Sequence, residues 1–472
     1  MVIAPTSLEK TLWAEAFETS VDFHRPDEPE TLRLSDVVSA LTFALDITEG
    51  QPEGHALRSC MIGMRMGEAL NLDAQQRSDL YYALLLKDLG CSSNAAKIST
   101  LFGADDQKVK KHYKTANLGE LSSGAKFVLN TAGTNQPLQK RIKHILDVSL
   151  GRGGGTEALM EIRCERGASI AQHMGFSRAI SEAIRALDEH WDGAGYPYKL
   201  EGEMIPLLGR ILCLAQTVEV FFQTYGAEAA RAMAKSRSGS WFDPQVVTAF
   251  LKVQAQADFW EMLASEGLSQ QVATLEPRDK MILSDEAQLD RVAEAFSQVI
   301  DAKSPWTYKH SEGVRHFAVG AATQLGFEPQ KLRELSRAAL LHDLGKLSIP
   351  NTILDKPGRL TEEEFAVIRK HPEYTEQIMK RVKPFENLAL IAGAHHERMD
   401  GRGYHRGVSA GTLPLEARLL AVADQFEALT STRPYRQGLT SQAAIALIAK
   451  DVGKRVCEVS LVALEGFLET LK

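Results

Sequence analysis

Seven of the thirteen histidines lie within residues 310–405, and two adjacent pairs stand out in that segment. His342 directly precedes Asp343, and His395 directly precedes His396. Imidazole nitrogens and carboxylate oxygens together suit divalent ions such as iron, manganese and zinc. A histidine–aspartate pair can offer its nitrogen to one ion and its carboxylate to a second ion as a bridge. The segment therefore predicts a metal centre.

The complete set of candidate ligands is larger than one ion needs, which favours a dinuclear centre. Its members are His310, His342, Asp343, His371, His395, His396 and Asp424. A lone histidine on an apolar helix face is usually a packed or surface group, and we interpret His316 in this way. The joint pattern differs, because these groups continue apolar faces where an unpaired polar group is costly to bury.

Helices must position these ligands, because apolar residues recur at three- and four-residue spacing and alternating β-branched runs are scarce. Leu335, Ala339 and His342, for example, share one face of a predicted helix. The sequence therefore predicts an all-α fold. Residues 1–30 are polar and contain proline, which is typical of a loose leader. A second polar stretch, 265–286, contains glycine and proline and is the best candidate for a linker.

The chain on the two sides of this linker resembles one module present twice. His55 precedes Asp88 by 33 residues, and His310 precedes Asp343 by the same separation. The matching segments are LLKDLG (85–90) with LLHDLG (340–345), and DEHWDGAGYP (188–197) with HERMDGRGYH (396–405). The second match has an offset of 208 residues. A repeat of this length indicates two tandem domains.

The two copies differ in length. Between its matching blocks the first copy, residues 31–264, has 75 residues where the second copy, residues 287–472, has 28. The first copy therefore carries an insertion of 47 residues.

The second copy contains five segments that together are highly specific. They are HDLGK (342–346), IPNTILDKPGRLTEEE (349–364), HP (371–372), HHERMDGRGY (395–404) and ARLLAVADQFEALTSTRPYR (417–436). In combination they resemble the HD-GYP branch of the HD-domain phosphohydrolases, over about residues 290–472. The resemblance implies two tandem helical domains of HD type. It also implies a bacterial phosphodiesterase that converts cyclic di-GMP to pGpG or GMP, or that prefers cyclic GMP–AMP.

The resemblance also assigns roles to residues of the second copy. The seven candidate ligands would hold two divalent ions, with Asp343 as the bridge and a hydroxide between the ions. Iron or manganese is the expected metal, and nickel, cobalt, magnesium and zinc are alternatives. Lys346 would lie near the scissile phosphate, and Tyr404, Arg433 and Arg436 would hold the nucleotide and its phosphates. The chemistry agrees, because a metal lowers the pKa of its water and forked arginine donors match phosphate oxygens.

Two positions depart from the family pattern. His405 stands where the family has proline after Gly403 and Tyr404, and proline would fix the loop backbone. This replacement removes no ligand, but it leaves loop geometry and substrate preference open. Trp306 stands where some relatives carry a glutamate for a third metal, so two ions are expected.

The first copy keeps His55 and Asp88 but has lost five of the seven ligands. The replacements are Lys87 for His342, Arg163 for His371, Leu187 and Asp188 for His395 and His396, and Gln216 for Asp424. Lys87 would place a cation where a metal should lie. We therefore expect a degenerate HD-GYP-like module that binds no dinuclear centre and that packs against the second copy, dimerises or senses a ligand.

Composition excludes several classes of protein. The net charge of −7, from 54 basic and 61 acidic residues, argues against binding of duplex nucleic acid. The five cysteines are scattered and form no CxxC pair, which excludes a disulfide framework and favours a reducing cytosol. No apolar run is long enough to span a membrane, and the N-terminus lacks a signal-peptide pattern. We expect a cytoplasmic protein with no membrane partner.

Three functions remain open from the sequence. The leading one is a cyclic-dinucleotide phosphodiesterase with one catalytic and one degenerate module. The second is another HD-type phosphohydrolase that acts on nucleotides or a phosphate monoester. The third is a signalling scaffold that binds nucleotide without hydrolysis. Homodimerisation through the first module is a further expectation, and the sequence does not separate cyclic di-GMP from cyclic GMP–AMP.

Overall fold

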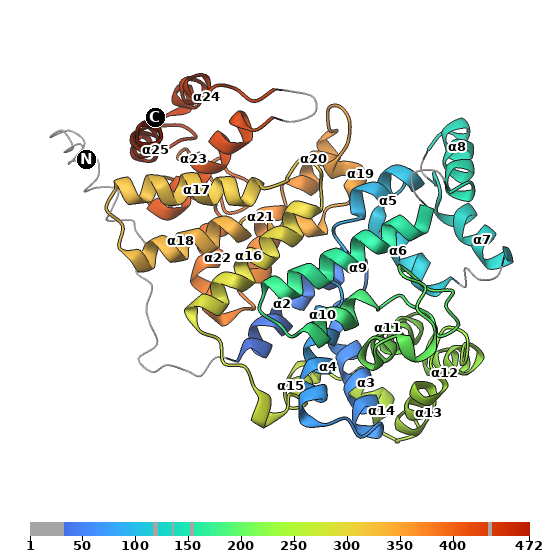
Figure 1. Cartoon of the computed structure of the whole chain (residues 1–472). Coiled ribbons are helices and arrows are strands. Elements are labelled where there is room, and N and C mark those ends of the chain that lie inside the picture. The colour runs from blue at the N-terminus through green and yellow to red at the C-terminus, as the bar shows by residue number, and fades with distance from the viewer. Residues whose placement is uncertain (1–32, 117–120, 135, 152–154, 433–436) are drawn as a thin grey trace.

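A computed structural model describes residues 33–116, 121–134, 136–151, 155–432 and 437–472. Every regular element in this part of the chain is a helix, which confirms the all-α prediction. The N-terminal half, blue to green in Figure 1, and the C-terminal half, yellow to red, lie side by side. The predicted leader, residues 1–30, falls outside the described residues. No described helix is long and apolar enough to cross a membrane.

The N-terminal half contains fourteen α-helices and one short 3-10 helix among its described residues. They are α2 (Leu34–Thr48), α3 (His55–Ala69), α4 (Ala74–Leu86), α5 (Ala95–Phe102), α6 (Asp106–Thr115), α7 (Leu121–Thr131), α8 (Leu138–Ser149), α9 (Gly155–His173), α10 (Arg178–Arg185), η1 (Gly202–Met204), α11 (Leu207–Tyr225), α12 (Ala227–Ser236), α13 (Pro244–Val253), α14 (Phe259–Leu263) and α15 (Leu268–Ala273).

The C-terminal half contains ten α-helices and four short 3-10 helices among its described residues. They are η2 (Arg278–Lys280), α16 (Glu286–Ala302), α17 (His310–Gln324), α18 (Pro329–Leu341), η3 (Leu344–Ser348), α19 (Asn351–Leu354), α20 (Glu362–Ile368), α21 (His371–Met379), η4 (Lys383–Phe385), α22 (Glu386–Ala392), α23 (Leu415–Thr430), α24 (Ser441–Ile448), η5 (Ala449–Asp451) and α25 (Glu458–Thr470).

Local sequence explains where several of these helices begin. Thr361 caps α20, because its side chain accepts from the backbone of Glu364 while the Glu364 side chain accepts from the backbone of Thr361. Pro329 and Pro372 lie in the first turns of α18 and α21, where the missing N–H of proline has no partner to lose. Pro372 thus marks the start of α21 at His371, and α21 packs against η3, which directly follows Asp343.

One apolar core runs through both halves of the chain. Buried rings such as Tyr81 and Phe250 from the N-terminal half belong to the same cluster as Phe296 and Phe385 from the C-terminal half. A second, smaller core lies among α5 to α9. It contains Ile98, Phe102, Ala104, Val109, Phe127, Ala132 and Leu159. The region of the predicted insertion thus has apolar packing of its own, and Figure 1 shows α7 and α8 projecting from the body.

The predicted linker, residues 265–286, is packed against the N-terminal half. Leu268 and Val272 of α15 are buried. The two oxygens of Glu276 accept hydrogen bonds from the Ser35 hydroxyl at 2.7 Å and the Tyr82 hydroxyl at 2.6 Å. Residues 268–276 are thus held by contacts with the N-terminal half, whereas 278–283 are exposed, and the role of the segment as the domain boundary stays a prediction.

A buried polar contact joins the two halves beside the HDLGK segment. Asp106 of α6 accepts a hydrogen bond from the backbone N–H of Asn351 at 3.1 Å, and its second oxygen lies 3.3 Å from Lys303 Nζ. The neighbouring Gln107 amide donates to the carbonyl of Leu347 at 3.1 Å. The N-terminal half therefore holds the chain on both sides of residue 349, directly after the motif that carries Asp343.

Candidate metal centre

Helix ends bring most of the predicted ligands to one place. His310 opens α17, His342 and Asp343 follow α18, His371 opens α21, His395 and His396 follow α22, and Asp424 lies within α23. The structure brings all seven together. Potential ligand atoms of His310, His342 and Asp343 lie within 4.8 Å of one another, and so do those of His371, His395 and His396.

Asp343 lies between these two groups of imidazoles. Its Oδ2 atom lies 3.5 Å from His310 Nε2 and 3.3 Å from His342 Nε2. Its Oδ1 atom lies 3.4 Å from His371 Nε2 and 3.7 Å from His395 Nε2. One carboxylate therefore directs each of its oxygens to a different pair of nitrogens, which is the arrangement that a bridging ligand needs.

Asp424 completes the first of these groups. Its Oδ1 atom lies 3.3 Å from His310 Nε2 and 3.9 Å from His342 Nε2. Asp424 is buried, so its oxygens have little access to bulk water. The group around His310 thus offers two nitrogens and two carboxylates, whereas the other group offers three nitrogens and one carboxylate.

Backbone carbonyls fix the tautomers of three histidines. The Nδ1 atoms of His342, His371 and His395 each lie 2.6–2.7 Å from the carbonyl three residues earlier in the chain. A neutral ring that donates its Nδ1 proton in this way has a bare nitrogen at Nε2. Such outer contacts orient metal-binding imidazoles. The Nε2 atoms of all three rings therefore direct a lone pair toward the centre of the ligand cluster.

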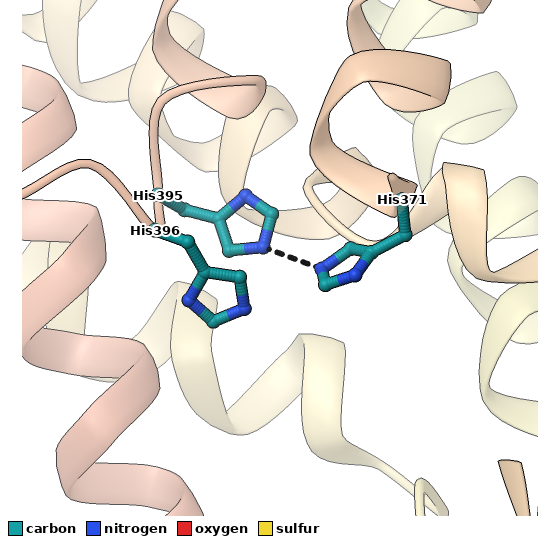
Figure 2. A group of neighbouring side chains, drawn as sticks. All are labelled: His371, His395 and His396. Atoms are coloured by element: carbon teal, nitrogen blue, oxygen red, sulfur yellow. Dashed lines mark hydrogen bonds between the residues drawn. The ribbon is translucent and has the colours of Figure 1, made fainter. Parts of the chain in front are cut away.

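The inward nitrogens fit a cation. Figure 2 shows the rings of His371, His395 and His396 converging, and the Nε2 atoms of His371 and His395 lie 3.0 Å apart. Two lone pairs at this distance repel each other unless a positive charge lies between or beside them. The buried atoms His342 Nε2 and Asp343 Oδ1 also have no hydrogen-bond partner among the described residues. The donor set and its unpaired atoms match what divalent metal ions require.

The protonation states of three of the histidines and of Asp343 agree with metal binding, whereas for His310 the lowering effect of burial is outweighed by hydrogen bonds to Asp343, Asp424 and Glu427, which raise the pKa of its imidazole. Burial lowers the pKa of the His371 and His396 imidazoles to about 3 and holds that of His395 well below its ordinary value. Burial raises the pKa of Asp343, but the nearby His342 and Lys346 outweigh that effect and hold it well below its ordinary value. These three rings are thus neutral and the carboxylate is ionised at neutral pH, as metal ligation requires.

Lys346 and Tyr404 lie at the edge of the ligand cluster, and their roles toward the substrate stay predictions. The Lys346 side chain is about one-fifth exposed, and its ammonium group contacts Asp343 Oδ2. The Tyr404 ring packs against the His396 ring with centroids 4.5 Å apart. Burial raises the pKa of the Tyr404 phenol, so its hydroxyl stays protonated and can donate a hydrogen bond. The other two predicted substrate residues, Arg433 and Arg436, lie outside the described residues.

His405, which replaces the family proline, is held by two carboxylates. Its Nε2 lies 3.1 Å from Glu376 Oε2, and its Nδ1 lies 3.6 Å from Glu397 Oε1. Glu397 also accepts from the backbone N–H of Arg406 at 2.9 Å. The loop after Tyr404 is therefore held by side-chain contacts in place of a proline ring, and its effect on substrate preference stays open.

Glu427 is a functional candidate that the sequence reasoning missed. Its carboxylate contacts Nδ1 of His310, while Nε2 of the same ring faces the ligand cluster. Glu427 follows Asp424 by three residues and so lies on the same face of α23. That spacing, and the glutamate at the corresponding position 219 of the first copy, are signals that could have identified it.

We expect Glu427→Gln to weaken metal binding by about 10- to 100-fold, because an amide orients the His310 ring less firmly than a carboxylate does. Turnover at saturating metal should change much less. Titration of metal-free protein with manganese, followed by activity and calorimetry, measures both quantities. Glu219→Gln is the matched control and should leave metal affinity unchanged. Wild-type metal affinity in Glu427→Gln would contradict this role.

The corresponding positions of the N-terminal half form a buried cluster with two cationic side chains at its centre. Lys87 Nζ lies 2.9 Å from His55 Nε2 and contacts Asp88. Arg163 lies 3.3 Å from Asp88 Oδ1 and 2.7 Å from Asp188 Oδ2. An ammonium and a guanidinium group thus neutralise carboxylates that would otherwise be buried without partners.

A further group in this half, Glu49, Asp88 and Cys91, has ligand atoms close enough to hold an ion. Lys114 Nζ already lies 2.7 Å from Glu49 Oε2 and 3.7 Å from Asp88 Oδ1. Burial raises the pKa of the Cys91 thiol well above its ordinary value, so the sulfur stays protonated. The charge of this group is already balanced, and it is a poor site for a cation.

Comparison with known proteins adds independent evidence. The sequence matches the HD domain family over residues 156–246 and 294–456. It is 41% identical to the 3'3'-cGAMP-specific phosphodiesterase 3 of Vibrio cholerae serotype O1, over 93% of this chain and 96% of that protein. It is 37% identical to the cyclic di-GMP phosphodiesterase response regulator RpfG of Xanthomonas campestris pv. campestris, over 40% of this chain and 51% of that protein.

A solved structure is similar over almost the same length. The crystal structure of a cyclic GMP-AMP specific phosphodiesterase of V. cholerae, V-cGAP3, superposes with a TM-score of 0.63 at 37% sequence identity. The match covers 93% of this chain and 99% of that one. The resemblance therefore includes the N-terminal half as well as the candidate metal centre.

Proposed function

The chain belongs to the HD-domain family, among its cyclic-dinucleotide phosphodiesterases of HD-GYP type, and we propose that it opens 3'3'-cyclic GMP–AMP at two divalent metal ions. The ions would be held by the seven ligands of the C-terminal half. Iron or manganese suits this set of nitrogens and oxygens, and metal supply would decide between them.

The arrangement around Asp343 carries the proposal of two ions. Each of its oxygens faces a separate pair of imidazole nitrogens at 3.3–3.7 Å. A mononuclear site would leave one of these groups as buried lone pairs without a positive charge, which is costly. The neutral His371 imidazole and the His342 Nε2 atom, which has no hydrogen-bond partner among the described residues, also support the binding of metal ions at this site.

Hydrolysis of a cyclic dinucleotide adds one water molecule across one P–O bond of the ring, and the product is a linear dinucleotide with one terminal phosphate. Two ions would supply charge neutralisation at phosphate and a water of lowered pKa. Lys346, partly exposed beside Asp343, can attract a phosphate oxygen of the substrate. The protonated hydroxyl of Tyr404 can donate a hydrogen bond to a second phosphate oxygen of the substrate.

The proposed preference for cyclic GMP–AMP rests on the extent of similarity. The relative named as specific for 3'3'-cGAMP matches along 93% of this chain, whereas the relative named for cyclic di-GMP matches along 40%. Both ligands contain guanine, so cyclic di-GMP is the natural second substrate.

We further propose that the N-terminal half is a degenerate copy of the same module, within the predicted boundaries of 31–264. Lys87 and Arg163 put fixed positive charges where the catalytic copy would place ions. A matching close approach supports the duplication. A Cβ at Gly90 would lie 1.9 Å from the carbonyl oxygen of Arg163, and a Cβ at the corresponding Gly345 would lie 2.0 Å from the carbonyl oxygen of His371, which corresponds to Arg163. Homodimerisation through this half stays a prediction.

The test combines metal analysis with product analysis. Protein purified without oxygen and loaded with manganese or iron should contain about two ions per chain. It should convert cyclic GMP–AMP to the linear dinucleotide with a higher kcat/KM than cyclic di-GMP or cyclic di-AMP. Two bound ions with no hydrolysis of any cyclic dinucleotide would exclude this proposal and leave another HD-type phosphohydrolase. Binding of the cyclic dinucleotide without any product would instead identify a signalling scaffold.

A further inference from the structure

A row of rings extends outward from the candidate metal centre. The Tyr404 ring packs on the His396 ring, and the Phe365 ring meets Tyr404 edge-on with centroids 6.2 Å apart. The guanidinium carbon of Arg369 lies 4.5 Å from the Phe365 centroid and 5.8 Å from the Tyr404 centroid. A cation is therefore held against two aromatic rings beside the ligands.

Arg369 has donors available for a ligand. The residue is exposed at the end of α20, and no described carboxylate lies within salt-bridge range of its guanidinium group. Contact with two rings holds the guanidinium group in place but uses none of its N–H donors in a hydrogen bond. A fork held in this way, with available donors, is a recognition element for a pair of acceptors.

The N-terminal half lacks this element. At the 208-residue offset that relates the two copies, Phe365 corresponds to Glu157 and Arg369 corresponds to Glu161, although Tyr404 still corresponds to Tyr196. Glu157 and Glu161 lie on the exposed side of α9, and Glu157 pairs with Lys199 at 3.7 Å. The arginine and phenylalanine thus occur in the copy that has the metal ligands, whereas the copy without them has two carboxylates.

We propose that Arg369, held by Phe365 and Tyr404, binds the guanine base of the substrate and makes the site select guanine-containing cyclic dinucleotides. This inference rests on the proposed function and adds a specificity residue to it. Guanine presents two adjacent acceptors, O6 and N7, that match the two donors of an arginine fork, whereas adenine presents an N6 donor beside N7. Tyr404 contacts both the ligand His396 and Arg369, so a nucleotide with its phosphate at the metal ligands would have Arg369 on the far side of Tyr404, in position to meet its base.

The experiment compares Arg369→Ala, Arg369→Lys and the wild type on three ligands, cyclic di-GMP, cyclic GMP–AMP and cyclic di-AMP. It measures kcat/KM, or the inhibition constant where a ligand is not turned over. We expect Arg369→Ala to lower kcat/KM for both guanine-containing ligands by about tenfold or more, mainly through a higher KM. The kcat/KM or inhibition constant for cyclic di-AMP should change by less than about threefold. Arg369→Lys should resemble Arg369→Ala, because lysine keeps the charge but loses the fork.

Lys370→Ala is the matched control, because it removes the same charge from the adjacent exposed residue. Lys370→Ala should leave kcat/KM or the inhibition constant unchanged for all three ligands. Metal content should stay at the wild-type value in every variant. Equal losses on all three ligands, rescue by lysine, or unchanged kinetics in Arg369→Ala would each overturn the assignment. Failure of the proposed function is distinct, because the wild type itself would then hydrolyse none of the three.

Discussion

Replacement of Asp343 by asparagine will remove both metal ions and lower hydrolysis of cyclic dinucleotides by at least about a thousandfold. The reason is that one carboxylate faces both groups of imidazoles, with its Oδ2 beside His310 and His342 and its Oδ1 beside His371 and His395. Asparagine keeps the shape of the side chain but offers a neutral amide, which cannot bridge two cations. The loss should therefore appear in metal content as well as in kcat.

Metal analysis and single-turnover product formation measure this effect. The wild type should contain about two ions per chain and Asp343→Asn fewer than one, with an unchanged far-UV circular dichroism spectrum. Asp279→Asn, an exposed aspartate in η2, is the control for removal of one negative charge and should behave as the wild type. An Asp343→Asn protein that keeps two ions and its activity would show that this carboxylate does not bridge.

The second large effect is expected at Gly345, which has no metal-binding group. A Cβ there would lie 2.0 Å from the carbonyl oxygen of His371 and 2.8 Å from the backbone nitrogen of Thr375. Both neighbours are backbone atoms of α21, so neither can rotate away. We expect Gly345→Ala to lower the free energy of unfolding by about 3 kcal/mol and to weaken metal binding, because η3 and α21 must separate and carry Asp343 away from His371.

Thermal unfolding with and without metal checks this prediction. A loss of about 3 kcal/mol should lower Tm by roughly 6–12 °C in a domain of about 150–250 residues. Gly411→Ala is the matched control, because no atom lies within 4 Å of a Cβ at that position and its backbone is not left-handed. It should change stability by less than about 0.5 kcal/mol. A Gly345→Ala protein with wild-type Tm and metal affinity would contradict the close approach.

The candidate ligands show why the sequence alone was sufficient to predict the site. Histidine and aspartate carry their chemistry in the residue type, and pairs such as His342 and Asp343 keep their proximity in any fold. Helix periodicity is also local, so the all-α class followed from spacing; His342, predicted on one face of a helix, lies directly after the end of α18. The internal repeat predicted the loss of ligands from the N-terminal half without any three-dimensional information.

Other features depend on which helices lie side by side. Glu427 gains its role because α23 packs on α17 and brings its carboxylate to the outer nitrogen of His310. Arg369 meets Tyr404 across two segments that are 35 residues apart in the chain. The polar segment 265–286 looked like a linker because its composition is hydrophilic, yet Glu276 is buried by hydrogen bonds to Ser35 and Tyr82. Composition cannot reveal partners that come from a distant element.

The sequence by itself determined the family and the helical class, and it predicted the candidate ligands and the absence of most of them from the N-terminal half, because each depends on residue types at fixed spacing. The tertiary structure decided which imidazole nitrogen faces inward, how the two oxygens of Asp343 divide between two groups, and that Lys87 and Arg163 neutralise the corresponding acids of the N-terminal half. Those properties arise from tautomers, carbonyl contacts and charge pairing, which exist only after helices from distant parts of the chain have packed together.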